Sequence, residues 1–392
     1  MAIDNKDKKI LNVPPLRFPE FSGEWKCTTI GNIGDIKNGP FGSVLHAEDY
    51  VENGIPIVTT EHFKTGLMPS DKFGIPQVSN EDYIRLKGYR LETNDIVFSR
   101  VGSVDINAHV GIEQNGWLFS GRVLRVRPKY DIDSLFLHYA LSTEAVKRDI
   151  RNRAVGQTMP SINTPILSST TIQLPKDLFE QKKVAHFLRL LDERIITQNK
   201  IIEDLKKLKS AIRKKMFSLL KDEYTESFEI NQLLDYEQPT AYIVANDEYS
   251  TDTSLTPVLT ANKGFILGYT DEKFGIYQKG ECIIFDDFTM DAKYVSFPFK
   301  VKSSAIKILT AKPNVNLRFM FEYLSYWELK SEGHKRHYIS EIASLVIELP
   351  SKERQSIIAS LMTSLNSKLD IEAKTKIRYE EQKRYLLSQM FI

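Results

Sequence analysis

The sequence has few cysteines and no long apolar segment. Its 392 residues include only Cys27 and Cys282, which lie in different halves of the chain without metal-type spacing around either. A disulfide framework is therefore not expected, and a reducing compartment is the default. No apolar run reaches the about eighteen residues of a transmembrane helix, and residues 1–10 lack the apolar stretch of a signal peptide. We therefore expect a cytoplasmic protein without a membrane span.

Motifs for catalysis and cofactor binding are also lacking. Neither Gly-x-x-x-x-Gly-Lys-Ser/Thr nor Gly-x-Gly-x-x-Gly occurs, and the Asn/Asp-Pro-Pro-aromatic motif of adenine methyltransferases is missing. Asp286, Asp287 and Asp291 could hold a metal ion in a nuclease site, but we interpret them as a solvated acidic loop. His334 and His337 have no further ligand pair for zinc. The sequence thus predicts no catalytic residue, no bound cofactor and no metal site.

The net charge of only +2 does not indicate a nucleic-acid binder, but its distribution is uneven. Residues 176–221 hold thirteen basic and six acidic side chains, whereas residues 222–346 hold twelve basic and nineteen acidic ones. A polyanion bound in the second of these segments must therefore meet a local basic patch, because the segment as a whole repels it.

Internal repetition is the strongest signal in the chain. Ile172-Gln173-Leu174-Pro175 is matched by Ile347-Glu348-Leu349-Pro350. Each tetrapeptide precedes a long charged stretch, and the stretches end in Met216-Phe217 and Met390-Phe391. After one residue is dropped behind the proline, the two stretches align without a further gap. One architectural unit is therefore present twice, as a globular module followed by a long helix.

Both long stretches have the alternating spacing of three and four residues that is typical of a coiled-coil seam. Polar residues interrupt the apolar pattern in register, Gln198 with Glu372 and Lys209 with Lys383. Such interruptions weaken packing but specify register and partner. The apolar seam positions of the first stretch are Leu188, Leu191, Ile195, Ile202, Leu205 and Ile212. Those of the second stretch are Met362, Leu365, Leu369, Tyr379 and Leu386.

The direction in which the two helices pair is open at this point. Antiparallel pairing would put the two modules at opposite ends, related by a pseudo-twofold axis, with the helices as a spacer. Parallel pairing would put both modules at one end, and the seam alone does not exclude it. Each helix of roughly 40 residues would be about 60 Å long.

The two modules show the pattern of a mixed α and β structure. Short β-type runs such as Asp95–Ser99 and Val123–Arg127 precede a helix near residues 133–151, with Ser134 as its cap. The second module repeats this order more loosely, with Glu281–Phe285, Ala305–Leu309 and a helix at Phe319–Trp327. Between these anchors the sequences differ thoroughly. We therefore predict one frame that holds two different binding surfaces.

Several short segments resemble the specificity (S) subunit of type I restriction–modification systems. The resemblance rests on the opening Leu16–Trp25, on Asn38-Gly39-Pro40-Phe41-Gly42-Ser43, on Asp95–Gly102, on Gly156-Gln157-Thr158 and on the helix around Leu191-Asp192. Their order and spacing cover essentially the whole chain. The second half lacks the Gly-Gln-Thr and Gly-Pro-Phe-Gly-Ser segments, so its binding residues are less well defined.

The resemblance implies an α+β fold in which two mixed α/β target-recognition domains are joined by two long antiparallel coiled-coil helices in a pseudo-twofold repeat. The expected parts are recognition domain 1 at 1–175, a central helix at 176–221, recognition domain 2 at 222–349 and a second helix at 350–392. Each domain would read one half of a bipartite, asymmetric site on double-stranded DNA. Two methyltransferase (M) subunits would dock on the helices, and restriction/translocase (R) subunits would join. S-adenosylmethionine, ATP and magnesium would bind to these partners.

DNA reading needs arginine and lysine for phosphates and guanine, asparagine and glutamine for adenine, and hydroxyls for either. In the first module the candidates beside glycine-bearing loops are Ser43, Thr59, Thr60, Arg100, Ser103, Asn107, Gln157 and Ser161. In the second module they are Thr260, Asn262, Lys263, Lys293, Tyr294, Lys335, Arg336 and Tyr338. The alternatives are a coiled-coil scaffold that binds only proteins, and a stand-alone restriction nuclease or methyltransferase.

Overall fold

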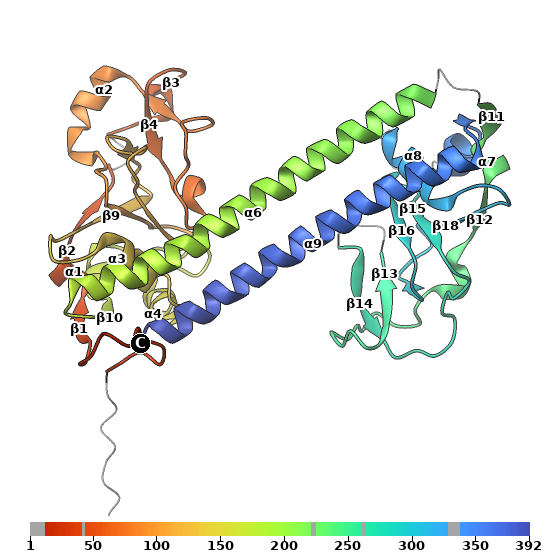
Figure 1. The fold of residues 1–392 in the computed structure, drawn as a ribbon. Coiled ribbons are helices and arrows are strands. Elements are labelled where there is room, and N and C mark those ends of the chain that lie inside the picture. Colours follow the sequence, from red (N-terminus) through yellow and green to blue (C-terminus); the bar gives the residue numbers. More distant parts are fainter. Residues whose placement is uncertain (1–11, 41–43, 221–224, 261–263, 328–337) are drawn as a thin grey trace, which may run out of the picture. The chain divides into compact units, whose positions relative to one another are not determined.

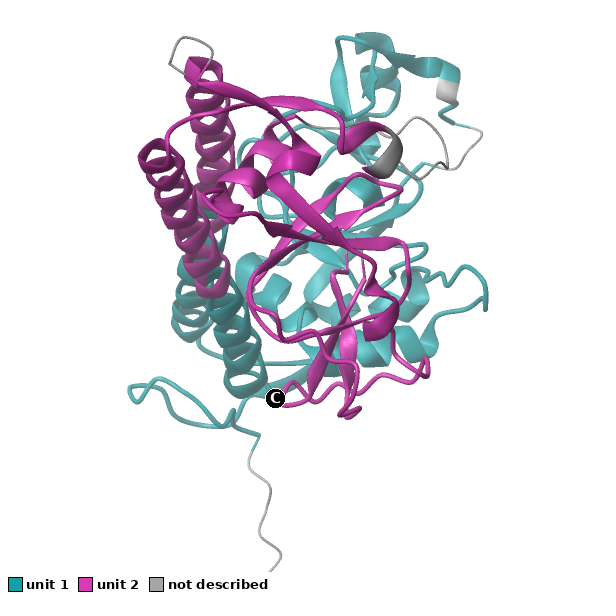
Figure 2. Ribbon diagram, turned by 90° about the vertical axis from the view of Figure 1, so that its right-hand side faces the viewer, with its two compact units in different colours: residues 1–197, 376–392 teal, residues 198–375 magenta. Residues whose placement is uncertain are grey.

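The computed structural model describes residues 12–40, 44–220, 225–260, 264–327 and 338–392 (Figure 1). The chain divides into two compact units, which Figure 2 shows in different colours. Unit 1 consists of residues 1–197 and 376–392, and unit 2 consists of residues 198–375. Each unit therefore combines one module with parts of both long helices. Among the described residues, no helix is both long and apolar enough to cross a membrane.

The two predicted long helices are α6, Leu178–Leu219, and α9, Lys352–Met390. They have 42 and 39 residues, which at 1.5 Å per residue corresponds to roughly 60 Å each. Contacts inside unit 2 show that they pair antiparallel. Gln198 meets Glu372 there, and Lys209 meets Asn366. The partner number on α9 falls as the number on α6 rises, so parallel pairing is excluded.

The seam positions are buried where a module covers the helices and half-buried elsewhere. Leu188 and Met362 are fully enclosed, and Leu191 and Leu386 are nearly so. The half-buried seam residues are Ile195, Ile202, Leu205, Ile212, Leu365, Leu369 and Tyr379. The polar interruptions lie in the same interface, where the Gln198 amide donates to both the carboxylate and the backbone carbonyl of Glu372. Burial of one seam leucine contributes about 1.5–3 kcal/mol.

The first module contains two four-stranded sheets. The main sheet is antiparallel in the order β2-β9-β6-β7, with strands Gly34–Asn38, Val123–Pro128, Ile96–Ser99 and Asn107–His109. The second sheet has the order β3-β5-β4-β8, with strands Tyr50–Val51, Gln77–Val78, Ile55–Val58 and Leu118–Phe119. Strands β4 and β8 pair in parallel. The short helices are α1 (Ile30–Ile33), α2 (Asn80–Arg85) and α5 (Thr164–Ser168).

The second module repeats the main sheet and part of the smaller one. Its antiparallel sheet β12-β18-β15-β16 has strands Leu234–Glu237, Ile306–Ala311, Cys282–Asp286 and Ala292–Val295. The smaller sheet β14-β13-β17 has strands Ile266–Thr270, Thr256–Leu259 and Lys300–Val301, and β13 and β17 again pair in parallel. Helix α7, Ile230–Leu233, takes the place of α1. The prediction of a common plan with divergent details agrees with this topology.

A pair of strands closes the entry and exit of each module. Strand β1 (Lys26–Thr29) pairs with β10 (Thr171–Leu174), and β11 (Glu226–Glu229) pairs with β19 (Val346–Leu349). The repeated Ile-x-Leu-Pro tetrapeptides are the ends of β10 and β19. Proline then stops the strand, because it has no N–H for the ladder, and the long helix begins within three residues.

The helix predicted near residues 133–151 is two helices, α3 (Ser134–Leu141) and α4 (Glu144–Arg153). The hydroxyls of Ser142 and Thr143 stabilise the end of α3, because they donate to the backbone carbonyls of His138 and Ala140. The cap is Asp133 rather than the predicted Ser134, since the Asp133 side chain accepts from the N–H of Phe136. Helix α8, Leu317–Tyr326, is capped in the same way by Asn316.

The core of each unit includes the end of the long helix that belongs to the other half of the sequence. In unit 1, Phe391 contacts Trp25 and Phe136 of the first module. In unit 2, Phe217 contacts Phe319 and other rings of α8. The repeated Met-Phe pairs therefore anchor each helix to the opposite module.

The beginning of each long helix holds its own module through one glutamine. Gln181 accepts the N–H of Asp133 at 2.9 Å and donates to the carbonyl of Pro175 at 3.0 Å. Gln355 makes the same two bonds, to Asn316 and Pro350, at 2.9 Å each. Both amides are buried, so each satisfies backbone groups that water cannot reach. The two halves thus use an identical attachment for different modules.

Candidate nucleic-acid interface

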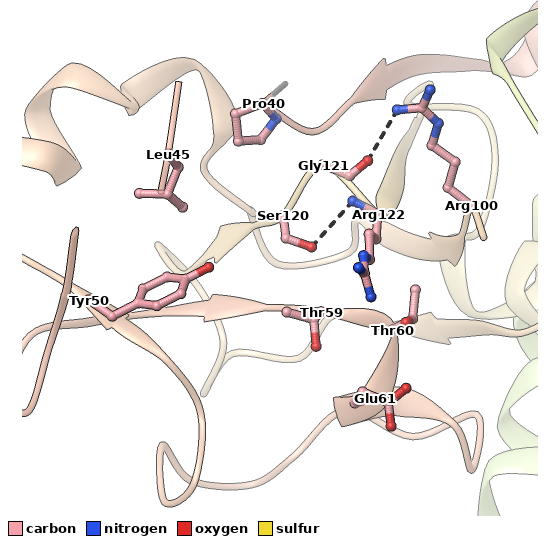
Figure 3. Close-up of a pocket in the computed structure, with 10 residues that line it drawn as sticks. All are labelled: Pro40, Leu45, Tyr50, Thr59, Thr60, Glu61, Arg100, Ser120, Gly121 and Arg122. Atoms are coloured by element: carbon pink, nitrogen blue, oxygen red, sulfur yellow. Dashed lines mark hydrogen bonds between the residues drawn. The ribbon is translucent and has the colours of Figure 1, made fainter. Parts of the chain in front are cut away.

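A cavity of about 470 Å³ lies in the first module, where the two sheets meet (Figure 3). Its walls come from loops that follow β2, β4 and β8 and from the residue after β6. The lining residues are Pro40, Leu45, Tyr50, Thr59, Thr60, Glu61, Arg100, Ser120, Gly121 and Arg122. We call this space the first-module cavity. Three of the predicted DNA-binding residues, Thr59, Thr60 and Arg100, therefore share one site.

Two glycines allow the chain to form the floor of the cavity. A Cβ atom on Gly39 would lie 1.9 Å from the carbonyl oxygen of Ser120, and one on Gly121 would lie 2.2 Å from that of Pro40. Any larger residue would force these backbones apart. The Gly-Pro of the segment that resembles recognition domains therefore has a steric role at the site.

The two arginines of the cavity differ in how their guanidinium groups are used. Arg100 donates to the carbonyl of Gly121 at 3.1 Å, which fixes part of its side chain. Arg122 is exposed, and within the described part of the chain its guanidinium has no hydrogen-bond or ion-pair partner. Figure 3 shows the Arg122 side chain extending toward Thr59 and Thr60. Its five donors are therefore available to an acceptor that enters the cavity. Sequence reasoning missed Arg122, although it stands directly before a buried strand.

Thr59 begins the tight turn that follows β4. Its N–H donates to Nδ1 of His62 at 3.0 Å, and burial lowers the pKa of His62, which keeps the ring neutral and able to accept. Thr60 is half-buried and lines the cavity beside it. The turn thus presents two hydroxyl side chains on a fixed backbone.

The other predicted residues of the first module gather on two adjoining loops. Ser103 and Gln157 are exposed, and Ser161 is half-buried. The loops are joined by backbone bonds from Gly102 to Pro160 at 2.8 Å and from Ile162 to Arg100 at 2.9 Å. Arg100 therefore connects the cavity to the loop that carries Gln157.

Asn107 does not belong to this surface, contrary to the sequence prediction. It is 2% exposed, and its amide bonds Nδ1 of His138 at 2.7 Å and the hydroxyl of Ser142 at 3.2 Å. Since both ends of the amide are occupied inside the module, Asn107 holds β7 to α3. Its position next to a glycine-bearing loop suggested a contact, but Asn107 and the next residue, Ala108, are both buried, so both faces of β7 are covered there.

In the second module, Thr260 follows β13 as Thr59 follows β4, and it is half-buried. Lys293 is also half-buried, with no side-chain partner among the described residues. Tyr294 is held in place, because its hydroxyl donates to Glu281 at 2.5 Å and the Arg318 guanidinium stacks on its ring. The predicted residues that lie outside the described residues are Ser43, Asn262, Lys263, Lys335 and Arg336.

Tyr338 is buried, so the prediction that it contacts DNA is corrected. Its ring packs against Tyr236 and Phe285, and its backbone N–H donates to Asp287 at 2.8 Å. Burial raises the pKa of its hydroxyl. Because the neighbouring residues of the sequence are basic, the sequence alone did not show that this ring is buried in the core rather than exposed at the surface.

Of the three aspartates considered for a metal site, Asp291 is exposed, but Asp286 and Asp287 are not part of a solvated loop. Asp286 accepts the N–H groups of Phe288 and Thr289, and Asp287 lies 3.5 Å from the Lys307 ammonium. Both carboxylates are buried and have partners in the fold. Within the described ranges, no group of three potential ligands could hold a metal ion.

Comparisons with known proteins identify the family to which this chain belongs. The chain belongs to the family described as "Type I restriction modification DNA specificity domain", whose model matches residues 22–207 and again 223–381. The double match coincides with the repeat of module and helix. The resemblance noted in the sequence is thereby confirmed.

Relatives and solved structures agree with this family. The "Type I restriction enzyme EcoR124I/EcoR124II specificity subunit" of Escherichia coli is 39% identical over 178 residues, which are 41% of this chain and 43% of the relative. A putative MjaX specificity subunit of Methanocaldococcus jannaschii is 26% identical over 415 residues, 96% of this chain and 95% of the relative. The S subunit structure from M. genitalium covers 97% of this chain and 99% of its own, with a TM-score of 0.66 and 17% identity. That likeness confirms the predicted fold of two α/β modules and two long helices.

Proposed function

We propose that this chain is the specificity subunit of a type I restriction–modification complex and reads a bipartite, asymmetric DNA sequence, one half-site per module. One observation carries the proposal. The two halves have the same main-sheet order, closing strands and glutamine attachment, yet the loops that follow equivalent strands carry different side chains. Two modules that share one fold but differ in their loops can bind two different DNA half-sites.

The first-module cavity supplies suitable chemistry for the first half-site. The guanidinium of Arg122 can donate two parallel hydrogen bonds to O6 and N7 of a guanine. Thr59 and Thr60 can donate to or accept from a base edge or a phosphate. Gln157 and Ser103 extend the polar surface beyond the cavity on exposed loops. For the second half-site, Thr260 and Lys293 are the described residues that we propose as contacts.

The long helices have a second role in this proposal, which is to bind two methyltransferase subunits. Several large apolar side chains on α6 lie outside the seam and are exposed, namely Phe187, Leu190, Ile196, Ile201 and Leu208. Exposed apolar residues in such number on one helix support a protein interface. Methyl transfer, with S-adenosylmethionine, and translocation and cleavage, with ATP and magnesium, would take place on the M and R subunits. This chain would contribute no catalytic residue, and its helices would set the unread spacer.

Exchange of one module tests the proposal. Residues 1–175 are replaced by the corresponding module of a relative, and the chain is expressed with its methyltransferase subunits. We expect one half of the methylated sequence in host DNA to change while the other half and the spacer stay the same. A change in both halves would refute the assignment of one half-site to each module.

The two alternatives receive no support from the comparisons, and they are separable by experiment. A protein scaffold would show no salt-dependent affinity for DNA, whereas a DNA reader loses affinity steeply as salt rises. A stand-alone enzyme would cleave or methylate DNA when the pure chain is given magnesium and S-adenosylmethionine.

A further inference from the structure

Each module also contacts the paired helices through a small polar cluster, which we call a socket. Socket 1, in unit 1, consists of Tyr139, Asp192 and Lys383. Socket 2, in unit 2, consists of Glu322, Asn366, Lys209 and Arg213. In both, the module contributes one side chain from α3 or α8, and the helices contribute the others.

In socket 1 the carboxylate belongs to the helix. The Tyr139 hydroxyl donates to Oδ2 of Asp192 at 2.8 Å, and Nζ of Lys383 lies 2.5 Å from Oδ1 of the same carboxylate. The Lys383 ammonium is also 5.6 Å from the centre of the Tyr139 ring. The module therefore supplies a neutral phenol, and the two helices supply one anion and one cation.

In socket 2 the carboxylate belongs to the module. Glu322 is fully buried, and Arg213 donates to its Oε2 at 2.7 Å and 3.0 Å. Asn366 donates from Nδ2 to Oε1 of Glu322 at 3.2 Å, and its Oδ1 accepts from Nζ of Lys209 at 2.5 Å. The helix that starts at this module therefore supplies a neutral amide instead of an anion.

The two sockets occupy equivalent places in the repeat. The alignment that matches Gln181 with Gln355 also matches Asp192 with Asn366 and Lys209 with Lys383. Counting along α3 and α8 from their caps, Asp133 and Asn316, places Tyr139 where Glu322 stands. The lysine is thus the same in both sockets, while the carboxylate has moved from the helix to the module.

Exchanging the partners would produce a charge mismatch in either socket. A module with glutamate on socket 1 would bring two carboxylates together at one lysine, and like charges in a shielded place oppose ionisation of both. A module with tyrosine on socket 2 would leave Lys209 and Arg213 without an anion, and burying an unpaired charge is costly. The glutamine attachment, by contrast, accepts either module.

We propose that the pairs Tyr139–Asp192 and Glu322–Asn366 are matching determinants, which decide what kind of module a helix accepts. A helix with aspartate at this position fits a module that presents a phenol, and a helix with asparagine fits a module that presents a carboxylate. This inference concerns the docking of module on helix and does not depend on which DNA sequence is read. DNA reading could fail its own test without affecting it, and the reverse also holds.

A double-mutant cycle in the full chain tests the proposal. The variants are Tyr139→Glu, Asp192→Asn and the two combined, with hydrogen exchange of α3 and thermal unfolding as readouts. Each single substitution is expected to lower the Tm of unit 1 by about 10 °C, because Tyr139→Glu puts a second carboxylate beside Asp192 and Asp192→Asn leaves the Lys383 ammonium without its anion. The combined variant recreates the carboxylate, amide and lysine of socket 2, although Leu387 stands where Arg213 would be, and it should recover at least half of the loss. Exchange of α8 in unit 2 is the internal control and should not change.

The control for chemistry is Tyr139→Glu combined with Gln181→Ala, which removes a neighbouring contact without matching the charge. It should show no recovery. Where Tyr139→Glu alone gives no folded chain, return of folded chain on addition of Asp192→Asn counts as recovery. Losses that simply add in the Tyr139→Glu, Asp192→Asn variant, or an equal recovery with Gln181→Ala, would overturn the proposal.

Discussion

The guanidinium of Arg122 in the first-module cavity has no hydrogen-bond or ion-pair partner among the described residues, and this gives a prediction at the residue scale. Replacing Arg122 by alanine should weaken binding of the cognate first half-site by about 1–3 kcal/mol, the value of one bidentate base contact. Affinity is measured with the assembled complex on DNA that varies in one half-site at a time. Arg122→Ala with unchanged affinity and unchanged preference would show that the cavity does not read DNA.

A lysine at the same position separates two roles of the arginine. Lysine keeps the positive charge but lacks the planar fork. If Arg122 contacts only phosphate, the Arg122→Lys variant should bind better than Arg122→Ala and close to the natural chain. If Arg122 reads a base, the lysine variant should bind as weakly as the alanine variant. The second half-site serves as the control, because its recognition should be the same in all three proteins.

His138 predicts how the stability of unit 1 depends on pH. Its ring is enclosed beside Asn107, and its pKa lies well below the usual value, mainly because of burial and further because of the Lys383 charge. The folded state therefore binds the proton less readily than the unfolded chain, whose histidine titrates near ~6.5. The stabilising contribution is complete above that pH and is lost as the pH falls below it.

We expect the Tm of unit 1 to drop between pH 7.5 and pH 5.5, and His138→Gln to reduce that drop. His109, whose pKa burial also lowers, keeps part of the dependence. The measurement is calorimetry over this pH range, with His46→Gln at an exposed position as the control. An identical pH profile for His138→Gln and the natural chain would show that His138 does not titrate on unfolding.

The sequence indicated which side chains have groups suited to DNA binding, but it did not indicate which of these side chains are exposed. Thr59, Thr60 and Arg100 were selected because hydroxyl and guanidinium groups stood beside glycines, and they line one cavity. Asn107 and Tyr338 met the same criteria, yet both are buried. Both faces of β7 are covered at Asn107 and Ala108, and Tyr338 begins a short helix. A single sequence does not show which other elements cover such short segments.

At the scale of elements, the helix ends make a testable prediction. Phe391→Ala should remove a buried ring from unit 1 at a cost of about 3–5 kcal/mol, because Phe391 contacts Trp25 and Phe136. Phe217→Ala should have the same effect on unit 2. Hydrogen exchange should therefore increase in α3 for the first variant and in α8 for the second. The exposed neighbour Ile392 is the control, and Ile392→Ala should change neither.

This crossed pattern distinguishes the observed pairing from a simple order along the chain. If Phe391→Ala loosened α8 instead of α3, the antiparallel pairing of α6 and α9 would be wrong. The two long helices themselves were well predicted, because a spacing of three and four residues over forty positions is a strong signal. The break between α3 and α4 was not, because the hydroxyls of Ser142 and Thr143 end the helix without any proline or glycine.

At the scale of the whole molecule, the repeat was the informative feature of the sequence. It predicted two modules of similar plan, and the sheets β2-β9-β6-β7 and β12-β18-β15-β16 have the same order. Of the smaller sheet in the first module, sequence reasoning predicted only the strand Ile55–Val58, since the strands beside it have two residues. The direction of pairing also needed the structure, because a seam pattern is compatible with both directions. The contacts of Gln198 with Glu372 and of Lys209 with Asn366 are compatible with antiparallel pairing alone.

The exchange of helix ends between the halves has a consequence for biosynthesis. The first module leaves the ribosome long before residues 376–391, which complete its core, have been translated. Until then, the apolar side chains of Trp25, Phe136 and Leu188 lack their contacts with the end of α9. A transcript that ends inside the second module would leave these side chains exposed to solvent. Translation through the last turns of α9 is therefore needed before both cores are complete, and a chain that stops before Phe391 would expose apolar side chains of the first module.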